Sequence, residues 1–330
     1  MRRRDFLGTV GGAVAAMPFA VRAQPLERPR RVGVLMAFAQ SDAGWQRSTA
    51  LFQEALGKLG WTQGRNLQIE YRWGEADSGR IQRYATELAE LRPDVILAQA
   101  TVSIAALQRA TRTIPVVFAN VSDPVGSGFI ESLARPGGNI TGFSNFEPAM
   151  GGKWVEYLQE IAPQVRRIGF MYNPDTSPQV KSYLPSIESA TQSRRLQLIA
   201  TPVRDSAEIK LAIETMGREP GGGLVLPSDV FTFTNRELIV RLANQHRLAT
   251  IYPFSEFVRS GGLLSYGVDL ISQFGQAASY VDRILNGEKP GDLPVQSPTK
   301  FDLIVNVKVA QALGLTVPPT LLARADEIIE

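Results

Sequence analysis

Short apolar segments rich in β-branched residues alternate with helical patterns along the whole chain, and this alternation constrains the fold more than any other feature. Strands that are apolar throughout indicate parallel sheets with helices on both faces. In the first half we expect strands at residues 31–36, 67–71, 95–98 and 116–119, with helices at 45–59, 81–91 and 102–110. The first half therefore predicts a doubly wound α/β lobe.

The same alternation begins again at Arg166. The sequence RRVGVL at residues 30–35 is echoed by RRIGFM at 166–171, which suggests two related halves. The second half predicts strands at residues 168–172, 196–201, 224–227 and 249–252, separated by helices at 179–193, 207–216 and 235–247. A second α/β lobe is the expected result.

Three turn-rich stretches interrupt the alternation, at residues 135–142, 261–262 and 287–299. They precede, in turn, a helix at 149–161, a strand at 263–266 with a helix at 270–285, and a strand at 301–305. Three interruptions suggest three chain crossings between the lobes, and hence a hinge. The predicted fold class is α/β, with two doubly wound parallel-sheet lobes joined by a three-crossing hinge. Lobe 1 is expected at 30–143 plus about 262–295, and lobe 2 at 144–261 plus about 296–330.

The N-terminus has the pattern of an export signal. A charged start with Arg3 and Arg4 is followed by an apolar run and by a small-residue cleavage site that ends at Ala23. The arginine pair before Asp5 and a Phe-Leu pair resembles the twin-arginine consensus. We expect residues 1–23 to be a cleaved twin-arginine signal, residues 24–29 to be a flexible N-terminal segment, and the product to be periplasmic and soluble.

Charge and composition exclude several function classes. Removal of residues 1–23 takes away four arginines and one aspartate, which leaves basic and acidic side chains equal in number. A neutral chain gives no basis for nucleic-acid binding. The absence of cysteine excludes disulfides, thiolate metal sites and a lipid-anchored cysteine, and a single histidine, His246, cannot build a histidine metal cluster. The sequence predicts no enzyme, no cofactor and no metal.

Polar and aromatic residues follow the predicted strands, where open α/β sheets bind ligands. Thr101 and Ser103, at a helix start, are expected to hold a carboxylate with nearby backbone N–H groups. Carboxylates suited to an ammonium group are Asp123, Asp229 and Asp269. The remaining candidates are Asn173 and the aromatic walls Phe38, Trp45, Phe254 and Tyr266. Together they suit an α-amino acid.

Structural roles compete with these assignments. Asp123 precedes a proline and is typical of a turn, whereas Asp229 and Thr101 are positioned to cap helices. For Phe38 and Trp45, core packing is favoured over a ligand role. The ligand and structural readings of these residues stay open on sequence alone.

Three blocks of sequence carry a resemblance to a known family: TIPVVF at 113–118, SDPVGSG at 122–128 and LARPGGNITG at 133–142. With RVGVL at 31–35, DVILA at 94–98 and SYGVD at 265–269, the chain resembles the ABC transporter substrate-binding proteins of the tryptophan/tyrosine type. The resemblance implies a type I periplasmic binding protein fold and a cleft for an aromatic or branched amino acid or a related molecule. It also points to Thr101, Asp123, Asp229, Tyr266 and Asp269.

The resemblance implies partners as well: an ABC permease with its ATPase, besides the twin-arginine translocase during export. We expect a monomer with a small-molecule ligand. Two other functions are weighed beside transport. One is a periplasmic sensing module that signals to a membrane receptor, and the other is a cofactor-dependent exported enzyme, which the lack of cysteine and near lack of histidine disfavour.

Overall fold

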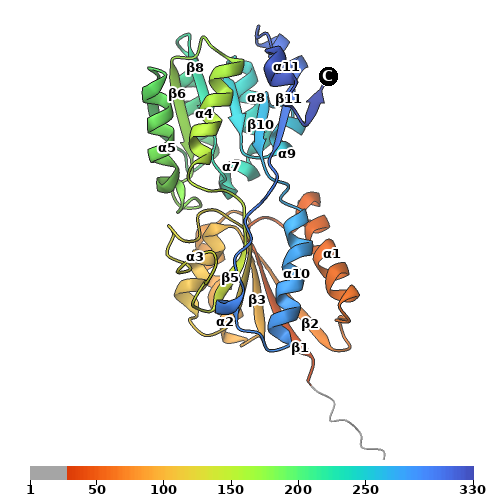
Figure 1. Cartoon of the computed structure of the whole chain (residues 1–330). Coiled ribbons are helices and arrows are strands. Elements are labelled where there is room, and N and C mark those ends of the chain that lie inside the picture. Colours follow the sequence, from red (N-terminus) through yellow and green to blue (C-terminus); the bar gives the residue numbers. More distant parts are fainter. Residues whose placement is uncertain (1–27) are drawn as a thin grey trace, which may run out of the picture.

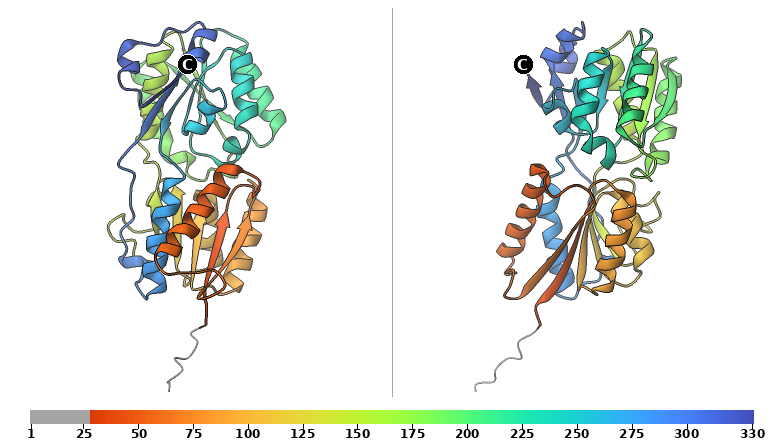
Figure 2. Two further views of the ribbon diagram at one scale, coloured as in Figure 1. Left: turned by 90° about the vertical axis from the view of Figure 1, so that its right-hand side faces the viewer. Right: turned by 180° about the vertical axis from the view of Figure 1, so that it is seen from behind.

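The protein consists of two α/β lobes stacked end to end (Figure 1). A computed structural model describes residues 28–330, so the predicted signal at residues 1–23 lies outside the described residues. Figure 2 shows the same two-lobed outline from the side and from behind, with lengths of chain running between the lobes. Each lobe is built on its own sheet.

The first lobe has a five-stranded, fully parallel sheet in the order β2-β1-β3-β4-β5. Its strands are β1 (Arg30–Met36), β2 (Leu67–Trp73), β3 (Val95–Gln99), β4 (Val116–Val121) and β5 (Ile140–Ser144). Its helices are α1 (Ala43–Lys58), α2 (Ser78–Glu90), α3 (Thr101–Ala110) and α10 (Ser272–Leu285). Helices α2 and α3 pack together on one face and α1 and α10 on the other (Figure 1).

The second lobe has a seven-stranded sheet in the order β12-β11-β10-β9-β8-β6-β7, parallel except where β10 meets β11. Its strands are β6 (Arg167–Tyr172), β7 (Gln197–Pro202), β8 (Gly222–Val225), β9 (Ala249–Tyr252), β10 (Leu264–Gly267), β11 (Asp302–Asn306) and β12 (Glu327–Ile329). Its longer helices are α4 (Met150–Ile161), α5 (Val180–Ser193), α6 (Ser206–Gly217) and α8 (Arg236–Gln245). Shorter ones are α7 (Val230–Thr234), α9 (Ser255–Arg259), α11 (Val307–Ala312) and α12 (Pro319–Leu322).

The predicted alternation of strands and helices is confirmed in both halves, but two strands, β5 and β12, were not predicted. The sequence around Gly142 reads as a turn, yet β5 adds to the edge of the first sheet. Gly142 has a φ of +151°, and a Cβ atom there would lie 2.1 Å from the carbonyl oxygen of Phe118. A glycine that looks like a turn residue is therefore needed for close pairing of β5 with β4.

The three crossings occur, but the second lies later than the expected boundary near residue 262. Strand β10 pairs with β9, so residues 264–267 belong to the second sheet and not to the first lobe. The chain then returns to the first lobe, where α10 packs on α1, β3 and β4. The crossing was predicted too early because the Gly261-Gly262 pair, which suggests a break between lobes, only ends helix α9 within lobe 2.

No helix between residues 28 and 330 combines the length and the apolar character needed to span a bilayer. Strands β1, β3 and β4 are almost entirely buried, as expected for strands covered on both faces. Their carboxyl ends point toward the second lobe (Figure 1).

Candidate functional site

The loops that follow strands of both sheets meet at the boundary between the lobes and enclose a small central cavity of about 20 Å³. This volume has room for about one water molecule. The cavity is lined by residues at the carboxyl ends of β3 and β4 or just after β1, β3 and β5 of lobe 1, after β8 and β9 of lobe 2, and from the second crossing: Phe38, Gln99, Ala100, Asn120, Asn145, Ser228, Asp229, Val230, Phe254 and Leu270. The strand ends of two sheets thus converge on one place.

Two lining residues have left-handed backbone conformations that non-glycine residues rarely adopt. Ala100 has φ = +71° and Asn120 has φ = +59°. Asn120 is held there because its N–H donates to Gln273 Oε1 at 2.9 Å and its Nδ2 donates to the carbonyl oxygen of Leu270 at 3.1 Å. Its Oδ1 is buried and has no partner among the described residues. Strain combined with an unpaired acceptor is typical of a functional site.

Helix α3 begins beside the cavity without a side-chain cap. Its N-cap residue is Ala100, and no side chain accepts from the first turn. The open N-terminus of a helix favours an anionic group through its free N–H groups and dipole. Thr101, expected to be the cap, instead accepts a hydrogen bond from the backbone N–H of Ser122 at 3.2 Å, so its hydroxyl joins two loops of lobe 1.

Asp229 lines the cavity, but its carboxylate already has four donors. Oδ1 accepts from the hydroxyl of Thr176 and from Phe231 N–H, while Oδ2 accepts from Asn173 N–H at 2.8 Å and from Thr232 N–H. Burial raises the pKa of Asp229, an effect that these hydrogen bonds partly oppose. A carboxylate has about four lone-pair sites, so Asp229 chiefly caps α7 and joins it to the loop that follows β6.

A cluster of aromatic rings from both lobes closes one side of the central cavity. From lobe 1, Phe38 stacks on Trp45 with ring centroids 4.5 Å apart. From lobe 2, Phe233 lies 5.1 Å from Phe38 and 5.9 Å from Trp45, and it also contacts Phe254 at 5.8 Å. All four rings are buried. Lobe-to-lobe contact here is therefore apolar and aromatic.

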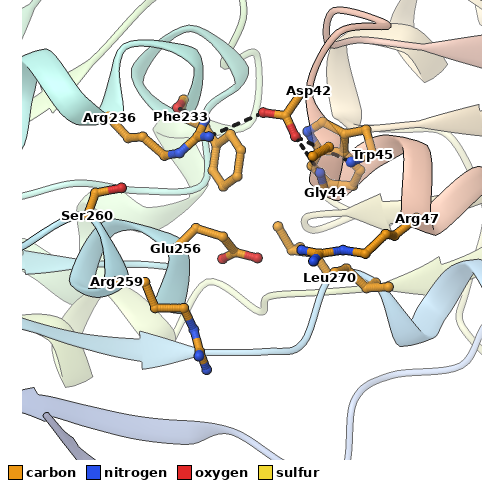
Figure 3. Close-up of a pocket in the computed structure, with 12 residues that line it drawn as sticks. Asp42, Gly44, Trp45, Arg47, Phe233, Arg236, Glu256, Arg259, Ser260 and Leu270 are labelled. Carbon is orange, nitrogen blue, oxygen red and sulfur yellow. Dashed lines mark hydrogen bonds and ion pairs between the residues drawn. The ribbon is translucent and has the colours of Figure 1, made fainter.

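A larger side chamber of about 260 Å³ lies next to this cluster (Figure 3). Leu270 lines both the chamber and the central cavity. The chamber is walled by Trp45 and Phe233 and carries charged side chains from both lobes: Asp42, Arg47, Arg236, Glu256 and Arg259. Its volume is close to the roughly 300 Å³ at which small-molecule pockets begin.

The charges in the side chamber differ in whether they are already paired. Asp42 and Arg236 form an ion pair across the cleft at 3.3 Å, and Arg259 pairs with Glu327 at 2.8 Å. Within residues 28–330, neither Arg47 nor Glu256 takes part in an ion pair. Burial raises the pKa of Glu256, with a smaller contribution from nearby Asp269. The indole Nε1 of Trp45 is a buried donor without a partner in this part of the chain.

The predicted site residues fall into two groups. Phe38, Asp229 and Phe254 line the central cavity. The others do not line it and instead pack or form hydrogen bonds within their own lobe or loop: Thr101, Ser103, Asp123, Asn173, Tyr266 and Asp269.

The structural surroundings of the second group are specific. The carboxylate of Asp123 accepts from Gly126 N–H at 3.0 Å in a turn, and Asn173 Oδ1 accepts from Asp175 and Thr176 N–H groups. Tyr266 packs on Tyr157 at 4.7 Å, and Asp269 is exposed at the second crossing, where it accepts from Ile271 N–H. Ser103 is fully buried, and its hydroxyl has no hydrogen-bond partner within residues 28–330.

Several residues of the cleft were not predicted to be functional. Asn120 is the next-to-last residue of β4 and could have been found by the strand-end rule. Phe233, Arg47 and Glu256 lie within helices or just inside their first turns, away from any strand end, and no sequence signal distinguishes them.

Two doubly wound lobes, joined by three crossings around a polar and aromatic cleft, define the type I periplasmic binding protein fold. The chain belongs to the ABC transporter substrate binding protein family, which it matches over residues 33–329. This is a family of solute-binding proteins and not of enzymes, as predicted.

Known relatives agree with this assignment. The chain is 26% identical over 264 residues to a tyrosine-binding protein of Clostridioides difficile strain R20291, covering 80% of this chain and 75% of that protein. It is 28% identical to a conserved domain protein from Vibrio cholerae O1 biovar eltor, with a TM-score of 0.83. A Streptococcus pneumoniae ABC domain in complex with L-Trp is 25% identical, with a TM-score of 0.81. Both structures cover 91% of this chain, and all of each is covered in turn.

Proposed function

We propose that this protein is the solute receptor of an ABC importer and binds an aromatic amino acid, tryptophan or tyrosine, between its lobes. One observation carries the proposal. Aromatic rings from both lobes, Phe38 and Trp45 on one side and Phe233 and Phe254 on the other, meet beside the strand ends of both sheets. Ring-on-ring contacts of this kind stabilise an aromatic ligand beyond simple burial of its surface.

The relatives support the choice of ligand class. One is a tyrosine-binding protein, and another has been solved with L-Trp. The cleft of this chain adds an unpaired acceptor at Asn120 Oδ1 and the uncapped start of α3. A hydrogen-bond donor and a carboxylate, both present in an amino acid, suit these two groups.

The mechanism we propose is lobe closure about the three crossings. In this structure the lobes touch through Phe233 and through the Asp42–Arg236 pair. The central cavity of about 20 Å³ cannot hold an amino acid, so a ligand reaches it only when the lobes separate. Ligand contacts with both lobes then favour the closed form, which the permease recognises.

The cellular setting belongs to the same proposal. A twin-arginine signal at residues 1–23 would take the chain to the periplasm, where it would act as a monomer with an ABC permease and its ATPase.

Isothermal titration calorimetry of the mature chain tests the ligand class. We expect L-tryptophan or L-tyrosine to bind with a dissociation constant in the micromolar range or tighter, and L-leucine and L-valine to bind more weakly, because they lack a ring. Absence of binding by every amino acid would contradict the proposal. Tight binding of L-leucine alone would replace the aromatic ligand by a branched one.

A further inference from the structure

We infer that Gln273 is a positioning residue that connects the central cavity to the hinge, because its side-chain amide ties the end of β4 to the chain crossings. The inference rests on the proposed function and adds how a ligand in the cleft acts on the crossings. These run through residues 145–149, 268–271 and 286–301. Gln273 lies in the first turn of α10, directly after the second crossing, and lines neither the central cavity nor the side chamber.

The amide of Gln273 is buried and bonds to two backbone groups. Its Oε1 accepts from the N–H of Asn120 at 2.9 Å, and its Nε2 donates to the carbonyl oxygen of Ser144 at 2.9 Å. The residue is only 6% exposed, so water does not readily replace either bond. Because one backbone group is a donor and the other an acceptor, a side chain must carry both an acceptor and a donor to satisfy them.

On the side of the cleft, Gln273 fixes a strained residue of the cavity wall. Asn120 lines the central cavity with φ = +59°, and such a conformation persists only where the surroundings hold it. Two bonds do so: its N–H donates to Gln273, and its Nδ2 donates to the carbonyl oxygen of Leu270 in the second crossing at 3.1 Å. Loss of the amide would release the backbone of Asn120 and shift a side chain of the cavity wall.

On the side of the hinge, the same amide reaches the first and third crossings through Ser144. Ser144 ends β5 and leads into the first crossing. Its N–H donates to the carbonyl oxygen of Gln296 at 2.8 Å, and its hydroxyl donates to the hydroxyl of Ser297 at 3.1 Å. Gln296 and Ser297 belong to the third crossing. Gln273 therefore lies at the junction of all three crossings.

This junction connects the third crossing to a ligand that it does not touch. No residue of 286–301 lines the central cavity or the side chamber. A ligand that restrains Asn120 should also restrain Gln273 and Ser144, and through them the third crossing. Restraint of this kind appears as slower amide hydrogen exchange at a distance from the ligand.

The experiment combines calorimetry with amide hydrogen exchange measured by mass spectrometry. Both use the mature chain and L-tryptophan or L-tyrosine, whichever binds wild type more tightly. Gln273→Met keeps the length of the side chain and removes the amide, and Ser144→Ala removes only the hydroxyl link to the third crossing. The matched control is Gln276→Met, which changes an exposed glutamine one turn further along α10.

We expect the ligand to slow exchange in peptides covering residues 296–301 in wild type and in Gln276→Met. Gln273→Met at saturating ligand should lose about half or more of this slowing, and its affinity should fall by about five- to fiftyfold. Ser144→Ala should lose part of the slowing and keep its affinity within about threefold of wild type. Thermal melting without ligand shows whether each variant is folded. If Gln273→Met is unfolded, exchange in Ser144→Ala decides.

The outcomes separate the two proposals. If wild type binds neither amino acid, the proposed function fails. If wild type binds the ligand while a folded Gln273→Met keeps the affinity and the slowing of Gln276→Met, the function stands and the positioning role of Gln273 is overturned, even if its melting temperature is lower. Ligand binding to wild type without slower exchange at 296–301 also overturns it, as does full slowing in Ser144→Ala when only that variant folds.

Discussion

The carboxylate of Asp42 and the guanidinium of Arg236 lie 3.3 Å apart and join the two lobes across the cleft. Asp42 also caps α1, where it accepts from the N–H groups of Gly44 at 2.9 Å and Trp45 at 3.3 Å. Arg236 lies over the ring of Phe233, 4.8 Å from its centroid. One ion pair thus connects the residues that present the aromatic walls of both lobes.

Arg236→Gln should shift the lobes toward the open form. The pair is about one-fifth exposed on each side, and its loss should weaken the closed form by about 1 kcal/mol, or roughly fivefold in ligand affinity. Small-angle X-ray scattering without ligand should show a larger radius of gyration. Arg241→Gln, an exposed arginine farther along α8, is the control and should leave both quantities unchanged. An unchanged radius for Arg236→Gln would contradict the assigned role of the pair.

Trp45 should report ligand binding by its fluorescence. Its ring stacks on Phe38 and lines the side chamber, so a ligand that enters the cleft changes its surroundings. Because tryptophan itself fluoresces, L-tyrosine with excitation at the red edge of indole absorption is the suitable ligand. The signal change should disappear in Trp45→Phe and persist in Trp73→Phe, whose ring stacks on Tyr71 and lines neither the central cavity nor the side chamber. Loss of the change in Trp73→Phe instead would place the ligand elsewhere.

Asp229→Ala should destabilise the second lobe more than it weakens ligand binding. Four protein donors lose their acceptor at once, and a buried cap of this kind contributes about 2 to 4 kcal/mol. Denaturant unfolding should show the loss. Asp205→Ala is a matched control, since Asp205 caps α6 through one hydrogen bond in an exposed position and should cost about 1 kcal/mol. If Asp229→Ala unfolds at the wild-type denaturant midpoint but has lost affinity for the ligand, Asp229 binds the ligand.

The sheets were predictable because each strand carries its own apolar run and each helix its own period, so both signals are local. The unpredicted β5 and the misplaced second crossing depend on which strand pairs with which, β5 with β4 and β10 with β9, and a local apolar run does not show which sheet a strand joins. The sequence alone therefore indicates that there are two lobes. The pairing of the strands is needed to show where the chain passes from one lobe to the other.

The site was less predictable than the sheets, and for a different reason. The strand-end rule located the loops correctly, but it does not determine which side chains turn into the cleft. At Ala100 and Asn120 the left-handed backbone redirects the chain, so Thr101 turns to Ser122 and Asn120 lines the cavity. Arg47 and Glu256 line the same chamber only because the two lobes face each other. Such a relationship leaves no pattern in the sequence.

Helix α10 lies against α1 in the first lobe although the strands before and after it, β10 and β11, belong to the second. Neither lobe is therefore a continuous length of chain. A single proteolytic cut at any crossing would leave the halves tethered by the other two, and no contiguous fragment can be cloned as one complete lobe. The ligand specificity of this protein can therefore be changed by altering side chains and loops, but not by replacing one lobe as a single continuous segment.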